Sequence, residues 1–312
     1  MKVVFMGSPA FALPALQSLM SNKYDISVVY TQPDKRAGRG QQVMQCAVKQ
    51  FAVASGLTVM QPETFKDPDA VRQLSGIQPD IIVVAAYGQI LPDAVLRIPK
   101  YKCINIHPSL LPKYRGPSPI AAAILNGDAE TGVTIMLIEN KVDSGPTLSQ
   151  RRLTIADEDD AESLSGELAG LGARLLIETL PNWAAGRIQP EAQDESLASY
   201  TRMETKEDGR LDLTLSAIQL WRKVRAYHPW PGSYVQWKEG RLKIIKSLPV
   251  NDDSQSQIGQ VIALPRMQAA RAAVQTGEGL LGLITIQPEG KREMVAADFI
   301  AGHRDFIGSF LT

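Results

Sequence analysis

The chain has 312 residues, of which 44% are hydrophobic and 21% charged, and its 33 basic residues balance its 33 acidic ones. These proportions exclude a disordered or fibrous chain, and the charge balance excludes nucleic-acid binding through a global positive charge. Any RNA contact must therefore come from a local patch. A chain of this length exceeds one ordinary domain and predicts two, each with its own core.

Short apolar runs alternate with helical stretches through the first part of the chain. Strands are predicted at residues 2–6, 26–31, 80–87, 103–106 and 133–138. Continuous apolar strands separated by helices are typical of a parallel sheet covered on both faces. Residues 1–189 are therefore predicted to form a doubly wound α/β domain with a mostly parallel sheet.

Residues 190–206 are polar and are predicted to be a linker. Residues 207–312 then begin with a helical segment at 215–227. Short strand-like runs follow, separated by Gly or Pro, at residues 233–237, 241–248, 260–264, 272–276 and 279–287. Strands at this spacing favour a small OB-like β-barrel as the C-terminal domain.

The turn after the first strand, MGSPAFA, contains one glycine and a proline. A dinucleotide-binding turn needs GxGxxG, because its glycines let the backbone approach a pyrophosphate. NAD-type binding is therefore not expected. The same Gly-Ser-Pro interrupts the apolar start of the chain too early for a signal peptide.

The two cysteines, Cys46 and Cys103, match no disulfide framework, which favours a reducing cytoplasm. No run approaches the ~18 apolar residues of a membrane span, so no membrane partner is expected. Metal catalysis is not expected either. His107, His228 and His303 are the only histidines, and the chain has neither HExxH nor paired cysteines.

Three polar residues follow neighbouring predicted strands. Asn105 and His107 stand two apart at the end of one strand, so they point to the same side of it. Open parallel sheets place their active sites at that end. Asn105 offers an amide donor, His107 offers an imidazole that can take up or release a proton, and Asp143 lies in the loop after the strand at 133–138. Each alone is more typical of a turn, so a catalytic site is inferred only from their convergence.

The motif NIHPSLLPKYRG at 105–116 resembles the signature of the 10-formyltetrahydrofolate-dependent formyltransferases. DSGP at 143–146 matches the aspartate of that family, and VVAAYGQILP at 83–92 is similar to the segment that lines its folate pocket. The resemblance implies that Asn105 donates a hydrogen bond to an oxyanion and that His107 stabilises the same charge or shuttles a proton. Asp143 would orient His107 or accept the amine proton through a water, and the sequence leaves both roles open.

The resemblance also implies which residues hold 10-formyltetrahydrofolate, the expected co-substrate. Gln89 and Leu91 would offer backbone hydrogen bonds to the pterin. Shape and main-chain groups of the SLLP loop would hold the folate, and its residues are Ser109, Leu110, Leu111 and Pro112. Without the family resemblance, packing of these loops against the core is the simpler interpretation.

Within the family, the segments at 31–41, 127–136 and 226–233 are most similar to members that formylate initiator methionyl-tRNA. The loop at 34–42 carries Lys35, Arg36 and Arg39, which alone would be typical of a solvated surface. The resemblance implies that this loop contacts the acceptor end of the tRNA, chiefly through Arg39. The C-terminal domain is expected to bind tRNA as well, and the protein is expected to be a monomer.

Two other functions remain open from the sequence. The first is a formyltransferase of the same superfamily that acts on an amino sugar nucleotide and would share Asn105, His107 and Asp143. The second is a non-catalytic RNA-binding protein that uses the α/β domain as a scaffold. The basic loop at 34–42 together with the segment AYHPWPGS at 226–233 argues against the first. The three polar residues and the neutral net charge argue against the second.

Overall fold

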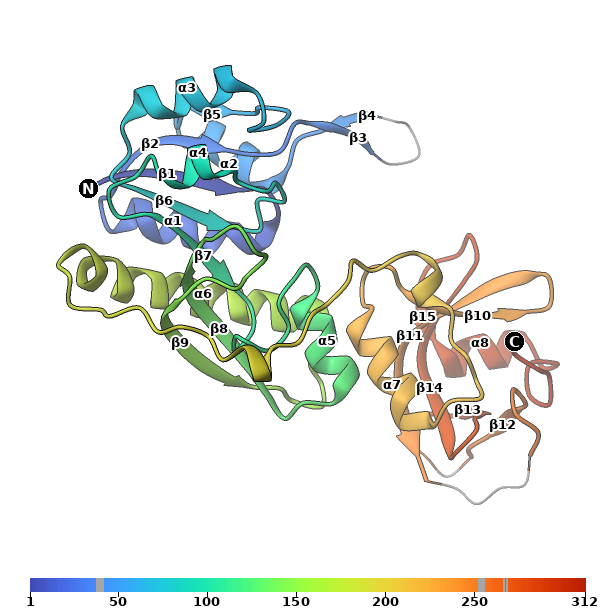
Figure 1. The fold of residues 1–312 in the computed structure, drawn as a ribbon. Helices are drawn as coiled ribbons and strands as arrows, with labels where there is room; N and C mark the ends of the chain where they lie inside the picture. Colours follow the sequence, from blue (N-terminus) through green and yellow to red (C-terminus); the bar gives the residue numbers. More distant parts are fainter. Residues whose placement is uncertain (38–41, 252–255, 266, 268) are drawn as a thin grey trace. The chain divides into compact units, whose positions relative to one another are not determined.

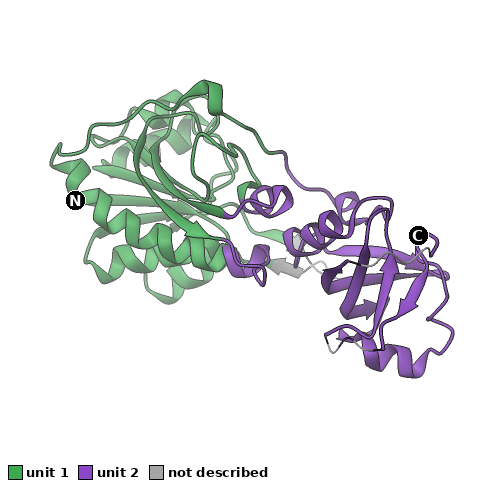
Figure 2. Cartoon of the chain, turned by 90° about the horizontal axis from the view of Figure 1, so that it is seen from below, with its two compact units in different colours: residues 1–119, 130–154, 165–201 green, residues 120–129, 155–164, 202–312 purple. Residues whose placement is uncertain are grey.

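The computed structural model describes residues 1–37, 42–251, 256–265, 267 and 269–312 (Figure 1). The chain divides into two compact units (Figure 2). Unit 1 contains residues 1–119, 130–154 and 165–201, and unit 2 contains residues 120–129, 155–164 and 202–312. The predicted linker, residues 190–206, is thus shared between both units.

Unit 1 is built on a seven-stranded sheet with the order β5-β2-β1-β6-β7-β8-β9. Its strands are β1 (Lys2–Gly7), β2 (Asp25–Tyr30), β5 (Val59–Met60), β6 (Ile81–Ala85), β7 (Cys103–His107), β8 (Glu130–Leu137) and β9 (Thr147–Thr154). The pairs from β5 to β7 are parallel, whereas the β7–β8 and β8–β9 pairs are antiparallel. The predicted mostly parallel sheet is confirmed.

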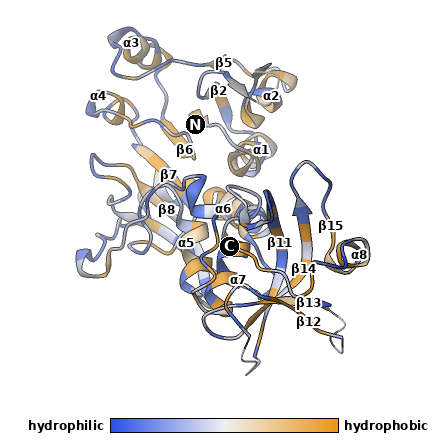
Figure 3. Cartoon of the chain, turned by 90° about the vertical axis from the view of Figure 1, so that its right-hand side faces the viewer, coloured by the Kyte–Doolittle hydropathy of each residue, from blue (hydrophilic) through white to orange (hydrophobic). Residues whose placement is uncertain are grey.

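The central strand β6 explains why this sheet could be recognised from the sequence. All of its residues are buried, and the strand is coloured hydrophobic in Figure 3. Strands covered on both faces have no solvent side, so they lack the polar alternation of half-exposed strands. The edge strand β9 was not predicted, because Gln150, Arg151 and Arg152 are exposed and interrupt its apolar pattern.

Helices follow the strands of unit 1. They are α1 (Leu13–Ser21), α2 (Ala47–Ala54), α3 (Pro68–Ile77), α4 (Asp93–Leu96) and α6 (Ala161–Ala184), with the 3-10 turns η1 (Ala10–Ala12) and η2 (Glu195–Leu197). The start of α3 is encoded locally, since Pro68 occupies the first turn and the side chain of Asp67 caps the N–H of Asp69. Of α5 (Pro119–Asn126), all residues after the initial proline belong to unit 2, as do the first residues of α6.

The segment predicted as a basic surface loop contains two short strands. β3 (Lys35–Ala37) and β4 (Gln42–Met44) pair antiparallel, with Lys35 opposite Met44. The loop is therefore a hairpin whose strands continue the chain from β2, as Figure 1 shows. Its tip, residues 38–41, lies outside the described residues.

Unit 2 contains an antiparallel sheet with the order β10-β11-β14-β13-β12, and β15 pairs with β14. Its elements are η3 (Glu207–Gly209), α7 (Ala217–Ala226), β10 (Ser233–Trp237), β11 (Gly240–Val250), β12 (Val261–Ala263), β13 (Ala272–Gln275), β14 (Leu280–Pro288), β15 (Met294–Val295) and α8 (Ala296–Gly302). A capping box formed by Ser216 and Gln219 starts α7.

The end of the chain closes this sheet into a barrel. Gln236 of β10 exchanges two backbone hydrogen bonds with Thr312. On the opposite side, Leu311 donates to the carbonyl of Gly259 and Gly308 donates to that of Val261. The edges of β10 and β12 are thus both paired, which leaves fewer open backbone groups. The predicted OB-like barrel is confirmed.

Candidate active site

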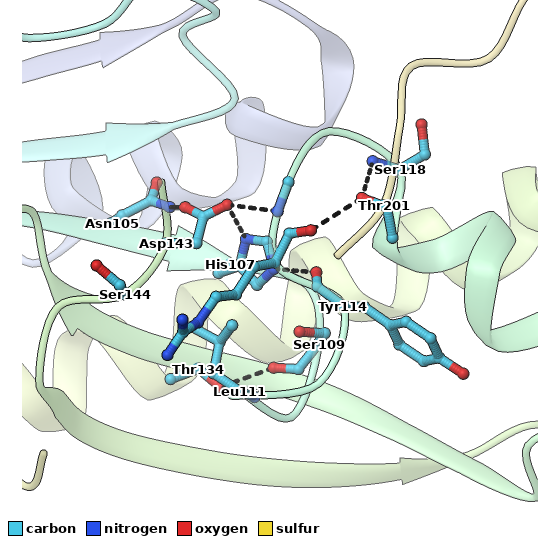
Figure 4. Close-up of polar contacts among 12 residues, drawn as sticks. Asn105, His107, Ser109, Leu111, Tyr114, Ser118, Thr134, Asp143, Ser144 and Thr201 are labelled. Atoms are coloured by element: carbon cyan, nitrogen blue, oxygen red, sulfur yellow. Dashed lines mark hydrogen bonds and ion pairs between the residues drawn. The ribbon is translucent and has the colours of Figure 1, made fainter. Parts of the chain in front are cut away.

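Asn105, His107 and Asp143 lie next to one another in unit 1 (Figure 4). Asn105 and His107 project from β7 on the same side, as their spacing predicts. Asn105 Nδ2 lies 3.5 Å from Asp143 Oδ1, and His107 Nδ1 lies 3.6 Å from Asp143 Oδ2. An amide, an imidazole and a carboxylate thus converge at the carboxyl end of a parallel strand.

The position of Asp143 depends on the antiparallel direction of β8, which the sequence did not predict. β8 runs antiparallel to β7, with Leu137 opposite Ile104, so the end of β8 lies beside the start of β7. The loop that joins β8 to β9 returns along the sheet and carries Asp143 to the two side chains. Asp143 has a left-handed backbone, with φ of 48°. Its Oδ2 also accepts a hydrogen bond of 2.8 Å from the N–H of Gly116.

His107 is held on both sides of its ring. Its side chain is only 5% exposed, whereas that of Asp143 is 18% exposed. Nε2 lies 3.0 Å from the carbonyl oxygen of Tyr114. A carbonyl can only accept, so Nε2 carries the hydrogen of this bond and Nδ1 is the nitrogen that faces Asp143. The imidazole therefore has one fixed orientation toward the carboxylate.

The SLLP loop after β7 is fixed by its own hydrogen bonds. Ser109 is buried, and its hydroxyl donates to the carbonyl of Lys113. Thr134 of β8 donates to the carbonyl of Ser109 and accepts from the N–H of Leu111, while Gln150 donates to the carbonyl of Leu111. Leu111 is buried, Leu110 and Pro112 are half-buried, and the Leu111–Pro112 peptide is cis. The side chain of Ser109 is thus used within the loop.

The loop after β6 presents unpaired backbone groups. Gln89 is half-buried and its amide donates to the carbonyl of Pro62, while Leu91 is buried in the same hydrophobic cluster as Tyr87. Ile90 between them is 83% exposed. Within the described residues, no hydrogen bond uses the backbone N–H or carbonyl of Gln89 or Leu91. Such groups need partners from outside the loop, as expected if they bind a ligand.

The basic hairpin is only partly described. Lys35 is exposed and its ammonium donates to the side chain of Gln32. Arg36 is in β3, and Arg39 lies outside the described residues. The role of these three residues in tRNA binding therefore stays a prediction.

Further residues, which no motif in the sequence singles out, surround Asp143. Arg115 is fully buried and forms a two-bond ion pair with Glu195, which raises the pKa of the guanidinium and lowers that of the carboxyl. Gln193 joins Arg115 to the Asp143 loop. Arg115 falls within the motif NIHPSLLPKYRG, but its partners belong to the predicted linker, so no local pattern pointed to them.

No described helix is both long and apolar enough to cross a membrane. In the same residues, no cluster of three or more His, Cys, Asp or Glu side chains is arranged to hold a metal ion.

Both parts of the chain match known families. A family model described as Formyl transferase matches residues 1–180, and one described as Formyl transferase, C-terminal domain, matches residues 204–304. Methionyl-tRNA formyltransferase of Roseiflexus sp. (strain RS-1) is 48% identical over 97% of this chain and 93% of that protein. The protein of the same name from Methylococcus capsulatus is 44% identical over 97% of each chain.

Solved structures of more distant proteins share the fold. An N-formyltransferase from Helicobacter canadensis, bound to folinic acid and dTDP-3-aminofucose, has a TM-score of 0.68 at 19% identity, covering 91% of this chain and 99% of that one. HypX from Aquifex aeolicus, in complex with tetrahydrofolic acid, has a TM-score of 0.66 at 18% identity; 98% of this chain is covered, which spans about half (48%) of HypX. At these identities the likeness concerns the fold alone. From the two family models and the close relatives, the chain belongs to the formyl transferase family.

Proposed function

We propose that this protein transfers the formyl group of 10-formyltetrahydrofolate to the free α-amino group of methionyl-initiator tRNA. The observation that carries the proposal is the 48% identity to a methionyl-tRNA formyltransferase over 97% of the chain. This identity extends through both units, so it includes the C-terminal barrel as well as the part that holds Asn105, His107 and Asp143. The product, formylmethionyl-tRNA, would serve translation initiation.

The residues present fit a reduced folate as donor. The unpaired backbone groups of Gln89 and Leu91 can donate to and accept from a pterin, whose edge carries both kinds of hydrogen-bonding group. The SLLP loop, residues 109–112, is held by β8, and its apolar residues Leu110 and Pro112 are half-buried, so part of their surface is free to contact a ligand.

The chemistry follows from the groups around β7. The lone pair of the methionyl amine attacks the formyl carbon, the carbonyl oxygen takes up negative charge, and the bond to the folate nitrogen then breaks. Asn105 donates a hydrogen bond to that oxygen, and one such donor is typically worth about 2.7–4 kcal/mol of the barrier. The proton lost by the amine must reach the leaving nitrogen. His107, with the Asp143 carboxylate 3.6 Å from its Nδ1, is proposed to move this proton or to stabilise the oxyanion.

The acceptor would be held by the basic hairpin and by the barrel. Lys35, Arg36 and Arg39 are proposed to contact the acceptor end, and each phosphate that they neutralise should add to the salt dependence of binding. In this scheme residues 1–189 are the catalytic domain, 190–206 connect the domains and 207–312 bind tRNA. We also propose that the enzyme acts as a monomer in the cytoplasm, where aminoacyl-tRNA is made and used.

A formylation assay tests the donor and the acceptor together. The purified protein is given 10-formyltetrahydrofolate with either methionyl initiator tRNA or a 4-amino sugar nucleotide. Transfer to the tRNA alone is expected. Transfer to the sugar alone would contradict the tRNA proposal and keep the catalytic one. Transfer to neither acceptor, together with no binding of a reduced folate, would favour the non-catalytic RNA-binding alternative.

A further inference from the structure

A short segment of the predicted linker holds the Asp143 loop in place. We name residues 191–201 the strap, because they run along the loop that follows β7 and along the start of β9. Glu191 exchanges two backbone hydrogen bonds with Thr147. The N–H of Arg115 donates to the carbonyl of Ser199, and the carbonyl of Arg115 accepts from the N–H of Thr201. All of these residues belong to unit 1. The strap is therefore part of the folded unit that contains the site.

Arg115 is the centre of this arrangement. Its side chain is 0% exposed, while that of its partner Glu195 is 68% exposed. The two guanidinium nitrogens lie 3.1 and 2.8 Å from the two carboxylate oxygens, and Nη1 also donates to the hydroxyl of Tyr200. Burying a charge is costly unless it is fully paired, so a guanidinium at this place requires the strap to be folded against it.

Gln193 links Arg115 to the Asp143 loop by hydrogen bonds. Its side-chain oxygen accepts a hydrogen bond of 3.0 Å from Nε of Arg115. Its amide nitrogen donates to the carbonyls of Asp143 at 2.9 Å and of Gly145 at 2.7 Å. Arg115 can only donate and the carbonyls can only accept, so the amide has one possible orientation. Gln193 thus clamps the backbone on both sides of Ser144.

The Asp143 carboxylate is also held by the backbone next to Arg115. The N–H of Gly116, the residue after Arg115, donates to Oδ2, the oxygen that faces His107. Asp143 also has a left-handed backbone, which costs an aspartate on the order of 1 kcal/mol and persists only where surrounding contacts impose it. The hydrogen bonds from Gln193 to its carbonyl and from Gly116 to its side chain supply that constraint.

We infer that Gln193 and Arg115 are positioning residues for Asp143, which set the direction of its carboxylate toward His107 and Asn105. The inference rests on the proposed function, because it concerns the rate of formyl transfer. Within the described residues, no hydrogen bond joins Gln193 to Asn105 or His107. Its replacement should therefore lower kcat while the KM for 10-formyltetrahydrofolate stays unchanged.

The test uses the full chain with Gln193→Ala and Gln193→Glu, and with Glu191→Ala as a control. Glu191 has an exposed side chain in the same strap. A misplacement of about 1 Å can cost about a hundredfold in rate, so we expect kcat of Gln193→Ala to fall by about tenfold to a hundredfold. The kcat of Gln193→Glu should fall as well, because a carboxylate cannot donate hydrogen bonds to the two carbonyls. Glu191→Ala should keep the kcat of the unchanged protein.

A double variant separates positioning from a merely structural role. If Gln193 acts through Asp143, then adding Gln193→Ala to Asp143→Asn should cause little further loss of kcat, because interacting residues are not additive. If the loss of kcat in the double variant equals the product of the losses in the two single variants, the inference would be overturned. An unchanged kcat in Gln193→Ala would do the same.

Amide hydrogen exchange gives a readout that does not need activity. Exchange of the Gly116 N–H, which is protected by Asp143, should become faster in Gln193→Ala and stay unchanged in Glu191→Ala. Equal protection of the Gly116 N–H in the unchanged protein, Gln193→Ala and Glu191→Ala would overturn the inference, whichever acceptor the enzyme formylates. Faster exchange in Gln193→Ala alone would support the inference, again whichever acceptor is used. The exchange experiment thus tests the positioning role of Gln193 separately from the proposed function.

Discussion

Oδ2 of Asp143 lies 3.6 Å from Nδ1 of His107, and the opposite ring nitrogen donates to a backbone carbonyl. The imidazole therefore cannot turn away from the carboxylate without losing that bond. Asp143→Asn keeps the shape of the side chain and removes its charge. We expect kcat for formyl transfer to fall by about 10²–10⁴-fold, the range over which acid–base assistance acts, measured under saturating donor and acceptor.

The control for this variant is Ser144→Ala. In the part of the chain that the structure describes, the hydroxyl of Ser144 donates to the carbonyl of Lys141, within the same loop, and has no bond to the Asp143 carboxylate. The change therefore disturbs the loop without removing a contact of the carboxylate. It should leave kcat close to that of the unchanged protein. A small effect of Asp143→Asn, or an equal loss in both variants, would show that the charge beside His107 does not drive the reaction.

Much of the fold could be predicted because its signals are local. The bounds of β10 match its predicted run at 233–237, and β6 was visible as an apolar run. Asn105 and His107 were placed together by the two-residue period of a strand. Their proximity to Asp143 was expected from neighbouring strand ends, but it depends on the antiparallel β8–β9 connection, which the sequence did not indicate.

Contacts between segments that are distant in the chain could not be predicted from the sequence. Gln193 lies 78 positions from Arg115 and 50 from Asp143. A glutamine in a polar stretch carries no periodic or motif signal, so the segment was interpreted as a linker. The role of such a residue follows only from its partners in the folded chain.

The two cysteines should differ in reactivity. Burial raises the pKa of the Cys103 thiol to about 12, whereas Cys46 is half-buried. At about pH 8.5, near the ordinary pKa of a free thiol, a thiol reagent should modify Cys46 in the folded protein and spare Cys103. Both should react in guanidinium chloride. Mass spectrometry of the labelled peptides decides the outcome, and rapid labelling of native Cys103 would contradict its burial.

The same shift predicts how stability depends on pH. The unfolded chain loses the Cys103 proton at a lower pH than the folded protein does. The stabilisation is therefore fully present below about pH 8.5 and is lost as the pH rises toward 12. Buried tyrosines such as Tyr30 act in the same direction. The difference in unfolding free energy between the unchanged protein and Cys103→Ala isolates the thiol, and it should shrink over this window in urea titrations.

The basic hairpin supplies a prediction about the acceptor. Arg39→Ala should raise the KM for methionyl-tRNA and flatten its dependence on salt, because one phosphate contact is lost. The dissociation constant for the reduced folate should not change, since the hairpin is proposed to contact only tRNA. Arg97→Ala is a suitable control, because Arg97 is an exposed arginine of unit 1 that pairs with Asp93. Weakened folate binding in Arg39→Ala would indicate a folding defect instead.

Two glycines of α6 should respond in opposite ways to alanine. A Cβ at Gly172 would lie 2.7 Å from Cγ2 of Ile106 and 3.2 Å from Val133, whereas Gly166 has nothing within 4 Å. Gly172→Ala is expected to destabilise the protein by about 1–3 kcal/mol through overpacking. Gly166→Ala should stabilise it by about 0.5–1 kcal/mol, because alanine favours the helix. Ile106 stands between Asn105 and His107 in β7, so Gly172→Ala should also lower kcat while Gly166→Ala should not. Urea unfolding and formylation assays measure both effects, and a Gly172→Ala protein as stable as the Gly166→Ala protein would contradict the close packing of α6 behind the site.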